Sequence, residues 1–266
     1  KGQCLAERGE RISPFMLGQF AAAGISLIQV FAKVRVGIFS SGDELRDPGT
    51  PLSDLAYGQI YDSNRLTVAK LLDDLPIQCV DLGCLPDDPK KIDDALLRAT
   101  DDCDVLITSG GVSVGDADYI VERIRRHGEL RFWRLNLKPG KPLAFGHIHS
   151  CWIFGLPGNP ISTIITALLV ARPAIAHLAG TSMPIPLRIV ATLKSTITHT
   201  AGRTEYQRGH FEYGIDGHTV THTGQQGSNR LSSFRNANCL IEIAKTQGDM
   251  QVGDEVIILP LTSLLH

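Results

Sequence analysis

Two lysines lie on one short, stiff segment, NLKPGKPLAFG, at residues 136–146. Lys138 and Lys141 are each followed by a proline, and Gly140 stands between them. Proline fixes φ, and glycine permits a tight bend or a close approach of the backbone to a ligand. A solvated pair of charges needs no such rigidity, so the segment predicts ammonium groups held for an anion. Alternation along a strand places Arg134 on the same side as Lys138, which would add a third cation.

Two glycine-rich turns could receive that anion. In SGGVSVGD, at residues 109–116, the glycines bring backbone N–H groups close to a ligand, and a helix beginning at Asp116 points its positive end there. In GLPGNP, at residues 155–160, a strand ends and a helix begins. The alternatives are an ordinary strand-to-helix turn and a well-made helix start. The sequence carries neither the dinucleotide fingerprint nor a Walker A loop.

Carboxylates gather at the predicted strand ends and helix starts. Capping of a helix N-terminus explains Asp62, Asp88 and Asp116 well. It explains Glu44, Asp87 and Asp118 less well. Carboxylates beside a phosphate cradle indicate Mg²⁺, which proteins hold by one or two of them together with substrate phosphate.

Three further groups are weighed against ordinary structural roles. His147, His149 and Cys151 have metal-like spacing, but they fall where a hairpin turn is expected, which favours exposed turn residues. In the C-terminal part, Arg203, Arg208 and Ser228 stand in turn sequences, unless another domain brings them to a cleft. No Ser-His-Asp set or nucleophile elbow is found.

Residues 34–180 alternate strand and helix patterns, which predicts a parallel sheet covered by helices, with ligands at the carboxyl ends of its strands. After about residue 185, short strands parted by Gly, Asp and Asn predict a small antiparallel β domain. The fold class is therefore a three-layer α/β domain followed by a β domain. The strands are expected at 34–42, 78–85, 104–111, 130–137 and 151–156, then at 187–197, 204–214, 218–224, 237–245 and 254–261; helices are expected at 63–75, 88–102, 116–128 (closed by Gly128) and 159–173.

The domain limits follow as 34–182 and 183–266. Residues 1–33 are expected to be a lead segment of an N-terminal domain that is largely absent from this chain, because no core of their own is visible.

The bulk composition limits the partners. The 266 residues are 43% hydrophobic and 20% charged with a net charge of −2, which gives no reason to expect nucleic acid or an anionic membrane as partner. The longest apolar segment is interrupted by Arg172 and Pro173, short of the roughly 18–20 residues of a membrane span. The six cysteines form no CxxC pair, which favours a reduced, cytoplasmic protein over a disulfide scaffold.

The chain resembles the molybdopterin molybdenumtransferase family (MoeA type), also seen in the gephyrin E domain. The resemblance rests on motifs that occur in order over about residues 34–235: SSGDEL, IYDSNR, PDDP, SGGVSVGDADY, FWRLNLKPGKPLAFG, GLPGNPIS, GRTEYQRG and GQQGSNRLSSF. It implies insertion of molybdenum from molybdate into adenylylated molybdopterin with release of AMP, the last step of molybdenum cofactor synthesis. The family's functional positions fall on Glu44, Asp87, Asp118, Lys138, Pro157, Pro160 and Ser228, and Arg134 replaces a family lysine.

The resemblance assigns roles as hypotheses. Lys138 and Lys141, with Arg134 or Arg203, would hold molybdate and substrate phosphate. Asp87 and Asp118, with Glu44, would hold Mg²⁺ or position water. The glycine turns would cradle the pterin phosphate through Gly110, Gly111, Ser113, Gly115, Pro157, Gly158, Asn159 and Pro160, and Ser228 would join the substrate site.

The implied partners are a second copy of the chain, because the family's site lies between subunits of a dimer, together with molybdopterin adenylyltransferase and molybdoenzyme maturation factors. Two other functions stay open. One is molybdopterin adenylylation, or other nucleotide processing, on the same α/β domain. The other is a binding or scaffold module of the gephyrin type.

Overall fold

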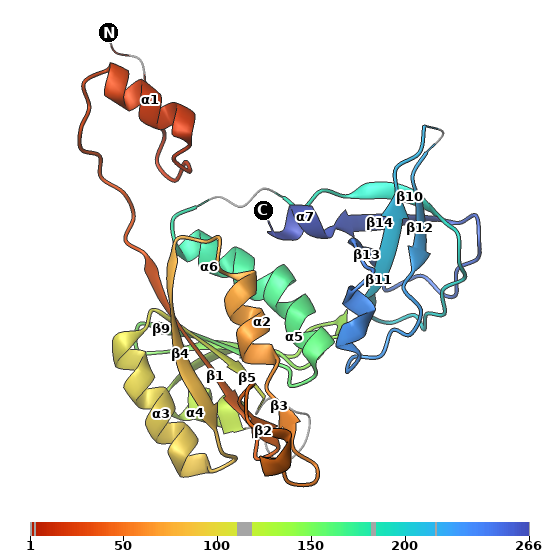
Figure 1. Cartoon of the computed structure of the whole chain (residues 1–266), viewed down its shortest axis with the longest axis horizontal. Coiled ribbons are helices and arrows are strands. Elements are labelled where there is room, and N and C mark those ends of the chain that lie inside the picture. Colours follow the sequence, from red (N-terminus) through yellow and green to blue (C-terminus); the bar gives the residue numbers. More distant parts are fainter. Residues whose placement is uncertain (1, 3, 111–118, 182–184, 216, 266) are drawn as a thin grey trace.

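The chain is built on two six-stranded sheets in the computed structural model, which describes residues 2, 4–110, 119–181, 185–215 and 217–265 (Figure 1). The first sheet has the strand order β4-β1-β5-β9-β8-β6. Strands β4, β1, β5 and β9 are parallel, whereas β8 runs antiparallel to both of its neighbours. Its strands are β1 (Val34–Ser41), β4 (Ile77–Leu85), β5 (Val105–Ser109), β6 (Gly128–Trp133), β8 (Ala144–Ile148) and β9 (Cys151–Leu156).

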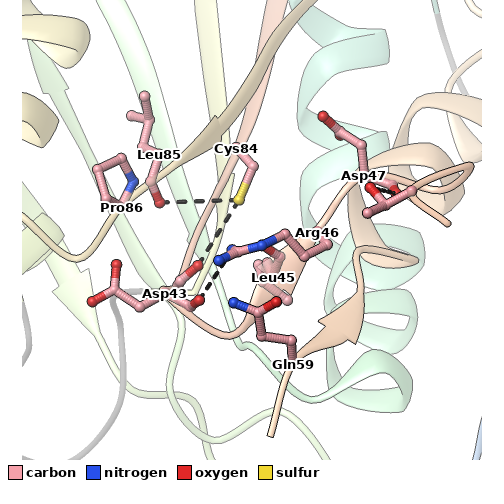
Figure 2. Close-up of a pocket in the computed structure, with 10 residues that line it drawn as sticks. Asp43, Leu45, Arg46, Asp47, Gln59, Cys84, Leu85 and Pro86 are labelled. Carbon is pink, nitrogen blue, oxygen red and sulfur yellow. Dashed lines mark hydrogen bonds between the residues drawn. The ribbon is translucent and has the colours of Figure 1, made fainter. Parts of the chain in front are cut away.

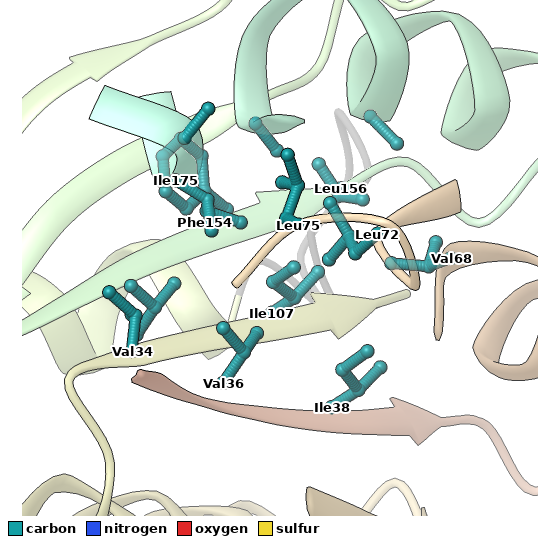
Figure 3. Close-up of a cluster of buried hydrophobic side chains, with 14 of the residues drawn as sticks. Val34, Val36, Ile38, Val68, Leu72, Leu75, Ile107, Phe154, Leu156 and Ile175 are labelled. Atoms are coloured by element: carbon teal, nitrogen blue, oxygen red, sulfur yellow. The ribbon is translucent and has the colours of Figure 1, made fainter. Parts of the chain in front are cut away.

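Helices cover both faces of this sheet, which confirms the predicted three-layer α/β class. On one face, α2 (Asn64–Leu71) and the helix that begins at Pro160 pack on Val36 and Ile38 of β1 (Figure 3). On the other face, α3 (Pro89–Asp102) and α4 (Tyr119–His127) pack on Phe39 of the same strand. Alternate residues of a strand point to opposite faces, so Val36 and Ile38 enter one core and Phe39 enters the other.

The helix caps follow from short polar side chains. Asp88 accepts from the backbone N–H groups of Lys90 and Lys91, as predicted for the start of α3. At α2, Asp62 accepts from the N–H groups of Asn64 and Arg65, whereas the Ser63 side chain makes no cap.

The long apolar helix differs from the prediction that Arg172 and Pro173 interrupt it. It runs from α5 (Pro160–Thr166) through a π-helical turn (Ala167–Ala171) into α6 (Arg172–Leu178). The N–H of Arg172 bonds to the carbonyl of Ala167, so the widened turn makes room for the proline ring. The stretch 160–178 is long and apolar enough to cross a membrane. However, 67% of its most apolar 18 residues are buried inside the fold, as expected of a core helix.

The second sheet is a small closed barrel, which confirms the predicted β domain. Its order is β12-β10-β14-β13-β11, and pairing between β11 and β12 closes it. Most pairs are antiparallel, while β10 and β12 are parallel. The strands are β10 (Ile189–Leu193), β11 (Thr204–Glu212), β12 (Thr219–His222), β13 (Cys239–Ile243) and β14 (Glu255–Pro260).

The segment 128–138 runs from the first sheet into the second. Residues 130–137 were expected to form a single strand, but β6 ends at Trp133 and Arg134 has φ of +92°. The chain then forms β7 (Leu137–Lys138), which pairs in parallel with Thr204 and Glu205 of β11. The lysine segment therefore joins the α/β layer to the barrel both covalently and by hydrogen bonds.

Gly128 does not close α4 as expected, because it is the first residue of β6. A Cβ at this position would lie 1.9 Å from the carbonyl oxygen of His147, on the neighbouring strand β8. The glycine is thus required by close strand packing.

The N-terminal segment stands away from both sheets (Figure 1). Its helix α1 (Pro14–Ala22) is capped by Ser13 and exposes Phe15 and Leu17. The remaining short elements are the two-stranded β2 (Leu45–Arg46) and β3 (Ile60–Tyr61), the 3₁₀ turns Leu52–Asp54 and Leu231–Phe234, and α7 (Leu261–Leu265). The predicted boundary near residue 183 lies outside the described residues and stays a prediction.

Candidate functional site

The KPGKP turn packs closely against the long helix that begins at Pro160. Gly140 is buried with φ of +115°, and a Cβ there would lie 2.6 Å from Cγ2 of Thr166 on α5. On one side the turn is anchored by the β7–β11 pairing. Lys138 is half-buried and Lys141 is exposed. The structure thus places two lysine residues on a turn that packs closely against the long helix.

A cavity of about 350 Å³ lies over this turn, between the α/β layer and the barrel. We call it the lysine cavity. It brings together Lys138, Lys141, Arg203 and Ser228, which are far apart in the sequence. The sequence left Arg203 and Ser228 as turn residues unless a neighbouring domain forms a cleft with them. The structure places both beside the lysine segment of the α/β layer, and their role as site residues stays a prediction. Sequence reasoning missed four other lining residues, namely Ser162, Glu205, Gln226 and Gly227.

Glu205 connects the cavity to a buried polar network. Its Oε2 accepts from Lys138 Nζ at 2.9 Å and from His199 Nδ1 at 2.7 Å. Its Oε1 accepts from Gln207 Nε2 at 3.2 Å. Glu205, His199 and Gln207 are all buried, so Lys138 is the member of the network with appreciable exposure, 43% of its side chain.

The barrel wall of the cavity is fixed by Arg208, which is fully buried. Its backbone N–H donates to Gln226 Oε1, and its guanidinium donates to Ser233 Oγ at 3.0 Å and to the Gly227 carbonyl at 3.4 Å. Burial lowers the pKa of Arg208 to about 10, while the charge of Glu205 acts in the opposite direction. The loop that carries Gly227 and Ser228 therefore rests on a buried cation.

The same loop touches the start of the long helix. The N–H of Ile161 donates to the Ser228 carbonyl at 3.0 Å. Asn159 precedes Pro160 as the N-cap residue, but its side chain makes no cap bond. The positive end of the helix thus lies beside the lysine cavity, where it favours an anion.

The glycine turns meet at the carboxyl ends of β1, β5 and β9. Asn64 Nδ2 donates to Ser109 Oγ and to the Gly158 carbonyl, both at 2.7 Å. Gly110 has φ of +102°, and a Cβ there would lie 2.5 Å from the Ser41 carbonyl oxygen. Pro157 is buried at the same edge, where its carbonyl accepts from Thr163. Gly111, Ser113, Gly115, Asp116 and Asp118 lie outside the described residues.

A second cavity, of about 620 Å³, opens at the carboxyl ends of β1 and β4 (Figure 2). We call it the carboxylate hollow. Its lining includes Asp43, Asp47, Arg46, Gln59 and Cys84, none of which carried a predicted role apart from the general mention of carboxylates at this edge. Figure 2 shows the Arg46 guanidinium reaching across to the main chain at Asp43 and Leu45, with hydrogen bonds of 3.1 and 2.6 Å.

The predicted metal ligands Glu44 and Asp87 are not among the described residues that line this hollow, but each lies next to one that is. The Asp87 N–H donates to Asp43 Oδ1 at 3.1 Å, and Glu44 Oε2 would be 2.6 Å from a Cβ placed on Gly42. All three carboxylates are exposed. No group of three or more His, Cys, Asp or Glu side chains is arranged to hold a metal among the residues that the structure describes. A pair of carboxylates together with substrate phosphate suits Mg²⁺, so the chemistry of the residues present fits that ion.

Arg134 does not share a strand face with Lys138, so that inference is wrong. Its guanidinium carbon lies 4.0 Å from the centre of the Trp133 ring, and the side chain is exposed. The break at φ of +92° turns the chain between the two residues. Arg134 is absent from the described lining of the lysine cavity.

The histidine and cysteine patterns have structural explanations. His149 lies in the tight turn between β8 and β9, as expected, with φ of +51°. Cys151 is instead buried, and burial raises the pKa of its thiol to about 12. All six cysteines are free.

Comparison with known proteins agrees with this architecture. Residues 37–177 match the family "Probable molybdopterin binding domain", and residues 190–261 match "MoeA C-terminal region (domain IV)". A molybdopterin molybdenumtransferase from Haemophilus influenzae is 38% identical over 269 residues, covering 100% of this chain and 65% of that protein. The chain belongs to the MoeA-type molybdopterin molybdenumtransferase family.

Other members extend the likeness. A gephyrin from Dictyostelium discoideum is 30% identical over 289 residues, covering 96% of this chain and 40% of that protein. The crystal structure of a MoeA protein from Pyrococcus horikosii superimposes with a TM-score of 0.81 at 28% identity, covering 98% of this chain and 62% of that one. The chain therefore spans about two-thirds or less of the length of these MoeA-family relatives.

Proposed function

We propose that this chain carries the molybdate-inserting part of a molybdenum cofactor synthesis enzyme. The full reaction would join molybdenum from molybdate to adenylylated molybdopterin and release AMP. The Haemophilus relative named molybdopterin molybdenumtransferase supports the reaction class, and so does the match of both domains to the family.

The observation that carries the proposal is the charge of the lysine cavity. Among its described lining residues, Lys138, Lys141 and Arg203 face a single carboxylate, Glu205, which leaves a net charge of about +2. A small tetrahedral dianion such as molybdate matches that charge. Rigid donors suit it better than mobile ones, because less side-chain freedom is lost on binding. The hydroxyls of Ser162 and Ser228 can add hydrogen bonds.

The carboxylate hollow would receive the nucleotide-bearing end of the substrate. We propose that Glu44 and Asp87, with Asp118, hold Mg²⁺ beside the phosphates there. The bound ion would supply charge neutralisation and an activated water. Asn64 would keep the turns at Ser109 and Gly158 in register, so that their backbone groups meet the pterin phosphate.

We further propose a homodimer in the cytoplasm. The exposed apolar side chains of the segment 14–31, including Phe15, Leu27 and Val30, support a partner surface. The free cysteines support a reducing compartment. Molybdopterin adenylyltransferase and molybdoenzyme maturation factors are the expected functional partners.

The competing adenylyltransferase role is less well supported. It would be carried out on the α/β domain, whereas five of the eleven described residues that line the lysine cavity come from the barrel. The experiment is rescue of a bacterial strain that lacks the molybdenum-insertion step, with full-length genes that carry Lys138→Ala, Arg203→Ala or, as a matched control, the exposed Lys90→Ala. We expect rescue by the wild type and the control only. Full rescue by both cavity variants would contradict the proposal, and ATP-dependent adenylylation of molybdopterin by the purified protein would favour the alternative.

A further inference from the structure

We propose that Glu205 is a positioning residue that fixes the Lys138 ammonium in the lysine cavity, with His199 and Gln207 holding its carboxylate. The inference rests on the proposed oxyanion site. The lysine stem has four rotatable carbons, so an unheld ammonium group would sample many positions. One charge-assisted hydrogen bond of 2.9 Å from Lys138 Nζ to Glu205 Oε2 restricts it and leaves two N–H donors for a ligand.

The burial of the network argues that Glu205 serves more than solubility. Its side chain is 5% exposed and that of His199 is 0% exposed. A buried carboxylate must be compensated by hydrogen bonds and opposite charge, and Glu205 receives three hydrogen bonds from three different side chains. Gln207 lies two residues further along the same strand, so the side chains share one face of β11.

His199 bears a cost that a purely structural residue would avoid. Its Nδ1 must donate to the Glu205 carboxylate, while its Nε2 is buried with no hydrogen-bond partner among the described residues. An unsatisfied buried polar atom is unfavourable, and an apolar side chain of similar size would remove it. An imidazole at this position is explained if the Nδ1 bond orients Glu205 toward Lys138.

Glu205→Gln should change the affinity for anions in the direction opposite to that expected from charge alone. Removing a negative charge beside an anion site should strengthen anion binding if charge alone acts. If Glu205 acts by holding Lys138, Glu205→Gln should weaken anion binding, because the Lys138 ammonium would then lose its freedom only when the ligand binds. Ordering one long side chain on binding corresponds to a roughly 2- to 10-fold rise in Kd.

The experiment titrates molybdate, and separately sulfate, into the full-length protein by calorimetry. We expect Glu205→Gln to raise both Kd values several-fold in the wild-type background, and to leave them unchanged in a Lys138→Ala background. The matched control is Glu242→Gln, the same change at a barrel glutamate that pairs with Arg188 away from the cavity. His199→Asn should keep near-wild-type Kd values, since the Asn amide can replace the Nδ1 donor, whereas His199→Phe should raise them. Tighter binding by Glu205→Gln, or an equal loss in both backgrounds, overturns the proposal.

A ligand-free measurement separates this proposal from the proposed function. In ¹⁵N-lysine-labelled protein, the held Lys138 ammonium should give a protected N–H signal that disappears in Glu205→Gln and persists in Glu242→Gln. If that signal behaves as expected but the wild type binds neither anion, the oxyanion function fails while the positioning role stands. If the signal is unchanged by Glu205→Gln, Glu205 does not position Lys138.

Discussion

Gly140→Ala should destabilise the protein strongly, because two separate costs meet at this residue. The first is backbone strain: φ of +115° is unfavourable for a residue with a Cβ, at about 1–2 kcal/mol. The second is overpacking. The new methyl would lie 2.6 Å from Thr166 Cγ2 and 3.3 Å from Leu137 Cδ2, and forcing atoms into a packed site costs about 1–3 kcal/mol. The sum is a loss of about 2–5 kcal/mol in the free energy of unfolding.

Two other glycines separate these costs. Gly253 has φ of +98° but nothing within 4 Å of its added Cβ, so Gly253→Ala isolates the backbone strain. Gly248 has open space around its Cβ and no positive φ, so Gly248→Ala should be neutral or slightly stabilising through the unfolded chain. The difference between Gly140→Ala and Gly253→Ala gives the packing cost of the turn against α5.

The assay is urea unfolding followed by fluorescence, with the three variants and the wild type at one protein concentration. The expected order of midpoints is Gly248→Ala highest, Gly253→Ala intermediate and Gly140→Ala lowest. Equal midpoints for Gly140→Ala and Gly253→Ala would show that the KPGKP turn is not seated on the helix, which refutes the packing argument.

Three further predictions concern the scaffold of the site and the thiols. Asn64→Ala removes two hydrogen bonds of 2.7 Å between α2 and the glycine turns, so unfolding should become easier by about 1–3 kcal/mol in the same urea assay. Arg172→Ala removes a bidentate ion pair with Asp74, in which the arginine side chain is 1% exposed. Thermal unfolding should show a loss of about 3 kcal/mol in the free energy of unfolding, and a loss below about 0.5 kcal/mol would contradict this. Iodoacetamide at pH 8 should modify the exposed Cys4 well before Cys151, because burial raises the pKa of the Cys151 thiol to about 12 and keeps it protonated; equal rates by mass spectrometry would contradict the assignment.

Much of the fold could be predicted because its strands and helices have clear patterns. The alternating segments of the barrel became β10 to β14, and Asp88 capped α3 as the sequence indicated. Patterns failed where a backbone break or a tertiary contact decided the structure. The apolar run around Trp133 hides the turn at Arg134, and a local proline rule cannot foresee the π-helical turn that accommodates Pro173.

The cationic residues that line the lysine cavity could be named from the sequence, whereas their arrangement could be predicted only in part. Rigidity of the KPGKP segment identified Lys138 and Lys141, but the closing contact comes from β7 pairing with β11 across two domains. Glu205 and His199 gave no local signal, since a glutamate in a strand and a histidine in a loop are individually ordinary. One cue was available: Glu205 is a charged residue in a predicted strand, and it shares a face of that strand with the polar Gln207.

Glu44, Asp87 and Asp118 remain predicted metal ligands, and their role depends on the substrate phosphates. The exposed positions of Glu44 and Asp87 leave both open to a ligand. Removal of divalent metal with EDTA should therefore stop the proposed AMP release by the full-length protein without changing molybdate affinity, because none of the described residues that line the lysine cavity is a predicted metal ligand.

The central claim is that the lysine cavity binds the oxyanion. Crystals of the protein soaked in molybdate, with diffraction data collected at the molybdenum absorption edge, test it most directly. We predict an anomalous peak between Lys138, Lys141, Arg203 and Ser228, lost in crystals of Lys141→Ala. A peak confined to the carboxylate hollow, or an unchanged peak in the variant, would contradict the claim.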